Sequence, residues 1–90
     1  MRIAIAEITG PVAAGRSTAA TLRGEIESAA ARDSVVLDFS GVRVVAPSFA
    51  DELVAKLPAN VLEGGVVSVE GADATTVRLI DMVRRRRVPA

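Results

Sequence analysis

The chain has 90 residues, of which half are apolar, and its eleven basic side chains balance eleven acidic ones. This length predicts one small domain with a modest core and little room for an enclosed active site. Because the chain contains no cysteine and no histidine, its composition excludes disulfide frameworks, thiolate chemistry and proton transfer by imidazole, and with them most enzyme classes. Two phenylalanines, with no tryptophan or tyrosine, also disfavour stacking on nucleic-acid bases.

The N-terminal part of the chain predicts a strand followed by a helix. Arg2 to Ile8 form an apolar run that ends at Thr9-Gly10-Pro11, and Ser17 or Thr18 can begin a helix as its N-cap. The apolar positions that follow helical spacing are Leu22, Ile26, Ala29 and Ala30. Gly24 lies inside this helix and weakens it by ~1 kcal/mol relative to alanine; we interpret it as a tolerated glycine.

The most informative stretch is residues 35–57, VVLDFSGVRVVAPSFADELVAKL. It begins with a continuous apolar run, Val35 to Phe39, of the kind that buried parallel strands contain. After the break at Ser40-Gly41 a second apolar run, Val42 to Ala46, leads to a helix start.

A second helix is predicted to begin at Ser48, directly after Pro47. We expect Ser48 to be the N-cap and Asp51 to be the acid of a capping box, which places the hydroxyl at the positive end of the helix. The buried face is predicted to contain Phe49, Ala50, Leu53, Val54 and Leu57, and the outer face Asp51, Glu52 and Lys56. Pro58 ends the helix.

The last third of the chain predicts one more strand and one more helix. Val66 to Val69 form the strand after Gly64-Gly65. The helix that follows Gly71 is predicted to bury Ala74, Val77, Ile80 and Val83.

The alternation of three strands with three helices predicts an α/β domain with a mainly parallel sheet. Successive strands are expected to be neighbours, in the order first, second, third, with the crossover helices largely on one face. The other face is then poorly covered. Either a short additional strand lies within Val42 to Val45, or a second copy or another partner covers what remains. Residues 1–90 form one domain, with a basic tail at residues 84–90.

Three stretches of the chain resemble a known family. They are VVLDFSGVRVVAPSFADEL (35–53), the string Ser48 to Glu52 within it, and VEGADATTVRLIDMVRR (69–85). These residues are similar to the small STAS-like domains, which are relatives of the anti-sigma-factor antagonists and of the cytoplasmic domains of sulfate transporters. The resemblance implies a small STAS-like domain with the order β-α-β-α-β-α.

The resemblance also implies a site. In the antagonists, the second serine of an Asp-Ser-Ser-Gly turn lies at a helix start and is phosphorylated by a kinase partner. This chain has Ala46-Pro47-Ser48-Phe49 at that turn, and Ser48 falls on the second serine. The implied protein is a non-enzymatic regulatory module that docks a histidine-kinase-type ATPase or an anti-sigma factor and switches partners on phosphorylation. The implied partner-binding residues are Pro47, Ser48, Phe49, Asp51, Glu52 and Lys56.

The residues themselves leave two interpretations of Ser48. As a structural N-cap it would stabilise the helix by ~1 kcal/mol and have no other role. As a switchable contact it would carry a phosphate of about two negative charges, favoured by the helix dipole and opposed by Asp51 and Glu52.

Three acids, Glu7, Asp38 and Glu70, are expected near the C-terminal ends of the strands, where open α/β sheets bind ligands. They could hold Mg²⁺, or they could be solvent-exposed at this edge of the sheet and accept hydrogen bonds from nearby N–H groups. No phosphate-binding glycine loop follows these strands. We therefore favour the second interpretation and expect neither a metal nor a cofactor.

The run Arg84, Arg85, Arg86 and Arg87 ends the last helix, where cations interact favourably with the helix dipole. It is either a solvated helix end or a weak, salt-dependent anchor on nucleic acid or another anionic surface. Nucleic-acid or anionic-surface binding is one alternative function, and a purely structural oligomerisation domain is another. No apolar run approaches the ~20 residues of a membrane span, and the N-terminus does not resemble a secretory signal. The expected location is cytoplasmic.

Overall fold

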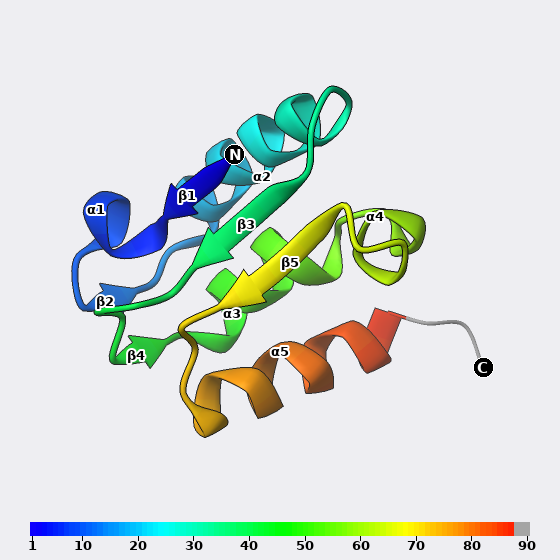
Figure 1. Ribbon diagram of the computed structural model, residues 1–90. Helices are drawn as coiled ribbons and strands as arrows, with labels where there is room; N and C mark the ends of the chain where they lie inside the picture. The colour runs from blue at the N-terminus through cyan, green and yellow to red at the C-terminus, as the bar shows by residue number, and fades with distance from the viewer. Residues whose placement is uncertain (88–90) are drawn as a thin grey trace.

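The computed structural model describes residues 1–87 apart from the side chains of Ala59 and Arg87, and helical segments separate the three longer strands along the chain (Figure 1). Residues 88–90 of the predicted basic tail lie outside the described residues. The elements are β1 (Arg2–Ala4), α1 (Ile5–Thr9), β2 (Val12–Ala13), α2 (Arg16–Ala30), β3 (Val35–Asp38), β4 (Val44–Val45), α3 (Pro47–Ala50), the π-helical segment η1 (Asp51–Ala55), α4 (Ala59–Glu63), β5 (Val67–Glu70) and α5 (Ala74–Arg87).

Three parallel strands form the main sheet in the order β1-β3-β5. Ala4, Asp38 and Glu70 lie side by side in the register of this sheet. The long connections between the strands contain the helices, and such connections allow parallel pairing. The predicted α/β class and the predicted order of the three strands are confirmed.

A second, two-stranded sheet lies at one end of the molecule. β2 pairs with β4 in parallel, with Val12 opposite Val44 and Ala13 opposite Val45. A short additional strand within Val42 to Val45, one of the two alternatives left open, is therefore present, although it pairs with β2 and does not join the main sheet.

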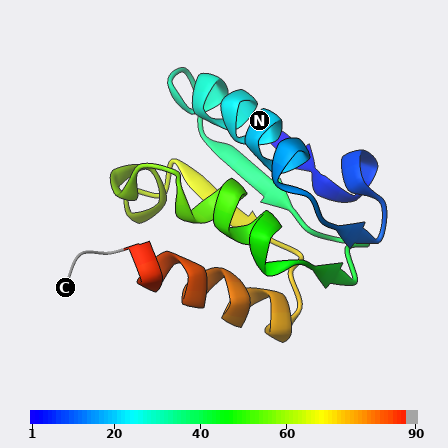
Figure 2. The same ribbon diagram turned by 180° about the vertical axis from the view of Figure 1, so that it is seen from behind.

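The helices lie largely on one face of the main sheet, as predicted. Figure 1 shows the sheet from its open side, and Figure 2 shows α2 and the α3–η1 segment covering the other side. Alternate strand residues follow this division: Ile3, Leu37 and Val67 are buried under the helices, whereas Arg2 and Ser68 are exposed on the open side. α5 packs against α3 and η1. That a second copy or a partner covers the open side stays a prediction.

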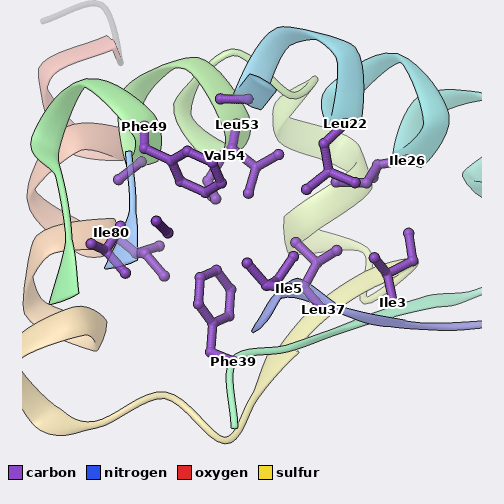
Figure 3. Close-up of a cluster of buried hydrophobic side chains, with 14 of the residues drawn as sticks. Ile3, Ile5, Leu22, Ile26, Leu37, Phe39, Phe49, Leu53, Val54 and Ile80 are labelled. Carbon is purple, nitrogen blue, oxygen red and sulfur yellow. The ribbon is translucent and has the colours of Figure 1, made fainter. Parts of the chain in front are cut away.

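The core is built from small aliphatic side chains around the two phenylalanines (Figure 3). Phe49 and Leu53 from α3–η1 point toward Leu37 and Phe39 below them, and Leu22 and its neighbour Ile26 from α2 close one side. All six side chains are at most 2% exposed. The predicted buried face of the second helix, Phe49 to Leu57, is thus confirmed.

The first predicted strand is too long. It ends at Ala4, and the residues that follow form helix α1 instead of continuing to Ile8. The hydroxyl of Thr9 donates to the carbonyl oxygen of Ile5 at 3.2 Å, and the N–H of Gly10 donates to a carbonyl of the same turn. An apolar run of this length does not distinguish strand from helix by periodicity. Strand β2 has two residues and helix α4 has five. Neither was predicted, because elements this short show no clear hydrophobic periodicity.

The N-cap of helix α2 lies two or three residues earlier than expected. Its first residue is Arg16 and its N-cap is Gly15, so neither Ser17 nor Thr18 caps it. Gly24 is exposed, and no atom lies within 4 Å of the position that a Cβ would occupy there. Gly24 is therefore tolerated and not required by packing.

The buried face of α5 differs from the predicted one. Ile80 and Val83 are buried as expected, but Ala74 and Val77 are exposed and Thr76 is buried in their place. Residues spaced strictly by three drift around a helix of 3.6 residues per turn, so four of them cannot share one face. The observed stripe uses the mixed spacing 76, 80, 83.

Candidate functional site

Ser48 is the second residue of helix α3 and not its N-cap. The N-cap is Ala46, whose extended backbone (φ −70°, ψ 141°) leads into Pro47 as the first helical residue. Proline suits this position because its fixed φ is helical and its missing N–H has no partner to lose. No side chain among the described residues caps the helix. The predicted N-cap role of Ser48 and the capping box with Asp51 are therefore wrong, because the helix begins at Pro47 and its N-cap lies two residues before Ser48.

The predicted partner-binding residues do not all reach the surface. Pro47 and Lys56 are exposed, and Ser48 and Asp51 are partly exposed. Phe49 is 0% exposed and Glu52 is 7% exposed. The expectation that the side chains of Phe49 and Glu52 face a partner is corrected, because Phe49 fills the core and Glu52 turns toward α2.

Glu52 is the centre of an ion cluster that joins η1 to α2. One carboxylate oxygen of Glu52 lies 2.5 Å from a guanidinium nitrogen of Arg23 and 2.9 Å from Nζ of Lys56, and the other lies 3.4 Å from Arg16. Arg23 also donates to the backbone carbonyl of Glu52 at 2.5 Å. Hydrogen bonds from Arg23 first, and then from Lys56, lower the pKa of Glu52 from 4.5 to about 2. A carboxylate that would otherwise be costly to bury is thus held ionised between the two helices.

Arg16 extends this cluster to the start of α3. It lies 3.3 Å from a carboxylate oxygen of Asp51, one turn after Ser48. Sequence reasoning did not connect Arg16 or Arg23 with Glu52 and the start of α3. The only local signal was the spacing of Glu52 and Lys56 by four residues, since both arginines lie about thirty residues away along the chain.

Exposed apolar side chains lie directly beside the helix start. Val12 is 54% exposed and Val44 is 56% exposed, and the two are opposite each other in the β2–β4 pair. The N–H of Ala46 donates to the carbonyl of Ala13 at 2.8 Å, which fixes this pair against the residue that precedes Pro47. Figure 1 shows β2, β4 and the start of α3 at the same end of the molecule. We call the surface formed by Val12, Val44, Pro47 and Ser48 the α3-start surface.

The strand-end acids are held by an arginine. Arg2 lies 3.2 Å from Asp38 and 2.6 Å from Glu70 on the open side of the sheet. The N–H of Ser40 donates to Asp38 at 2.9 Å, and this hydrogen bond is the first cause of the lowered pKa of Asp38, with Arg2 contributing less. Glu7 lies in α1 and is not a strand-end acid. Among the described residues no group of three or more acidic side chains is placed to hold a metal ion.

The arginine run is distributed around helix α5. Arg84 is partly buried, Arg85 lies 2.8 Å from Asp81, and Arg86 is exposed. Consecutive helical residues point about 100° apart, so these side chains do not form one basic face. The side chain of Arg87 lies outside the described residues.

A parallel sheet with its helices on one face, and with a helix start presented beside a short second sheet, defines a STAS-like α/β domain. Residues 18–63 match the family described as "STAS-like domain of unknown function (DUF4325)". The match spans half of the chain, and the chain belongs to this family. It runs from α2 through α4 and so includes Ser48, Glu52 and Arg23. The comparisons with curated proteins and with solved structures gave no significant match. No helix within residues 1–87 is both long and apolar enough to cross a membrane.

Proposed function

We propose that this STAS-like domain is a non-enzymatic regulatory module that docks a protein partner through the α3-start surface. The observation that carries the proposal is the exposed pair Val12 and Val44, each more than half exposed, beside Pro47 and Ser48. Apolar side chains at the centre of an interface, with a polar rim, are typical of protein docking sites. By family resemblance the partner is a histidine-kinase-type ATPase or an anti-sigma factor.

Ser48 is the proposed switch within this surface. A phosphate there would add about two negative charges beside the N-terminal turn of α3, where the helix dipole favours them. The acids that would repel the phosphate are already compensated, since Asp51 lies 3.3 Å from Arg16 and Glu52 is surrounded by three cations. The added charge would therefore act mainly on the docked partner. It would weaken docking, because the partner surface that contacts Val12 and Val44 is expected to be apolar.

Variants of the surface test the proposal by partner capture. The full chain is immobilised and exposed to native lysate, and captured proteins are quantified by mass spectrometry. The intact mass of the recovered chain is then measured to detect an added phosphate. We expect Val44→Asp and Ser48→Glu each to lower capture of the same protein by roughly tenfold or more, as removal of interface-centre contacts does. Thermal melting of each variant verifies that it is folded.

A matched control separates the site from the added charge. Ser28→Glu introduces the same charge at an exposed position near the other end of α2 and should leave capture unchanged. Equal capture by wild type, Val44→Asp and Ser48→Glu would contradict the proposal. Loss on Arg85→Gln/Arg86→Gln instead would favour anionic-surface binding, and no partner with any variant would favour a structural domain.

A further inference from the structure

The outer edge of β5 presents backbone hydrogen-bonding groups without partners in the described part of the chain. The N–H of Val35 donates to the carbonyl of Val66 at 2.7 Å, and the N–H of Phe39 donates to the carbonyl of Glu70 at 2.8 Å. Because strand residues alternate between their two neighbours, Val67 and Val69 direct their N–H and C=O groups away from β3. Within residues 1–87 no strand pairs with β5 on that side.

A groove lies between this edge and helix α5. It has a volume of about 500 Å³. Its apolar lining includes Val67 and Val69 from β5 and Val77 and Ile80 from α5. Val77 is 51% exposed, so the mouth of the groove is apolar as well. α5 packs on η1 and α3. At this edge of β5 Val69 is partly exposed, whereas Val67 is 2% exposed and therefore covered.

The charged side chains of the groove are mainly basic. Arg78 and Arg84 line it together with Asp81. Asp81 is paired with Arg85 at 2.8 Å, whereas neither Arg78 nor Arg84 has an ion-pair partner among the described residues. An occupant that carries acidic side chains would therefore complement the groove.

We propose that the β5–α5 groove binds an extended, acidic peptide segment of a partner protein, which hydrogen-bonds to the partly exposed Val69 and so extends the sheet at the edge of β5. Backbone hydrogen bonds to the free edge give such a segment its affinity, and its side chains give specificity. Alternate side chains of the segment contact Val77 and Ile80, and the acidic ones face Arg78 and Arg84.

A second copy of the chain fits this groove less well than an acidic peptide. In a two-fold symmetric pairing of β5 with β5, the same surface faces itself. Arg78 and Arg84 would then approach the same arginines of the other copy, and like charges at an interface oppose association. The groove is also separate from the α3-start surface, because it is built from β5 and α5 and not from β4 and α3.

Hydrogen exchange of the free protein gives the first test. We expect the amide protons of Ser68 and Glu70, which face β3, to be protected, and that of Val69 to exchange at least tenfold faster. Protection of Val69 in the free protein would show that the edge is already covered there and would overturn the proposal. Sedimentation velocity then tells whether a second copy covers it.

Synthetic peptides give the second test. The probe is a fluorescein-labelled peptide of eight residues that alternates valine with glutamate, and binding is measured by fluorescence polarisation. A matched peptide with lysine in place of glutamate should bind roughly fivefold more weakly or worse, because its charges repel the two arginines. A glutamate peptide that is N-methylated at alternate amides should lose about tenfold or more, because it cannot pair with the edge. Equal binding by all three peptides, or no binding by the first, would overturn the proposal.

Protein variants place the peptide in the groove. Arg78→Glu/Arg84→Glu should reverse the preference, so that the lysine peptide becomes the tighter ligand. Arg32→Glu is the control, because Arg32 is exposed in the turn after α2 and does not line the groove. Val44→Asp should bind the peptide as wild type does, so failure of this proposal and failure of docking at the α3-start surface are distinguishable. An unchanged preference in a folded Arg78→Glu/Arg84→Glu protein would rule out the groove.

Discussion

The same substitution, glycine to alanine, should have opposite effects at two positions of this chain. Gly24 is an exposed residue inside the 15-residue helix α2, and its Cβ position is empty within 4 Å. Alanine is favoured over glycine in a helix interior by about 1 kcal/mol, chiefly because glycine loses more backbone entropy on folding. In a domain of this size we expect Gly24→Ala to raise the melting temperature by about 4–8 °C.

Gly71 provides the contrast. It has φ +71°, where an L-residue is strained, and a Cβ there would lie 2.8 Å from a carboxylate oxygen of Asp38 and 2.8 Å from the backbone nitrogen of Ser40, in addition to meeting the Ser40 hydroxyl. The backbone strain alone costs about 1–2 kcal/mol. Gly71→Ala should lower the melting temperature by more than about 4 °C.

Circular dichroism melts of wild type and both variants measure the effect, with urea unfolding at 25 °C as a second measure. Each single methyl group is the same chemical change, so the sign of the shift depends only on local geometry. A melting temperature of Gly24→Ala at or below that of wild type would refute the argument from backbone angle and free space. So would a melting temperature of Gly71→Ala equal to that of wild type.

Three further predictions concern residues that hold the elements together. Phe49→Ala should destabilise the protein by about 3–5 kcal/mol in urea unfolding, because Phe49 is 0% exposed in the core; a loss below 1 kcal/mol would contradict its role. Glu52→Gln should lower the urea midpoint at pH 7. Because the folded pKa of Glu52 is about 2 and its usual value is 4.5, the stabilisation is complete above that usual value and is lost as the pH falls toward 2, so wild type and variant should converge there. Asp73→Ala should lower the melting temperature more than Asp73→Ser, because Asp73 accepts a 2.7 Å hydrogen bond from the N–H of Thr76 at the start of α5; equal losses would exclude a capping role.

Long periodic segments of the sequence predicted the fold well. The apolar run of β3 and the helical spacing of Leu22 and Ile26 in α2 have few competing interpretations, and both were correct. α1 and α4 have five residues each, and β2 has two. Such short elements are stabilised by contacts between residues far apart in the sequence, so local sequence patterns do not predict them.

The start of the helix that carries Ser48 was predicted to within two residues, but the surroundings of Ser48 were not. Pro47 is the signal that should have placed the helix start one residue earlier, since proline favours the first helical position. Glu52 was assigned to the outer face because it is charged, although it follows Phe49 by three residues and so lies near the buried stripe. Its burial depends on Arg23 in another helix, and a spacing argument cannot reveal a partner 29 residues away.

The central position of β3 has a consequence for how the domain can be divided. Its two neighbours, β1 and β5, come from opposite ends of the chain. A fragment limited to residues 18–63, the stretch shared with the family, keeps the middle strand and loses both flanking ones. In such a fragment both edges of β3 would be unpaired. The stretch that matches the family model is therefore shorter than the unit that folds.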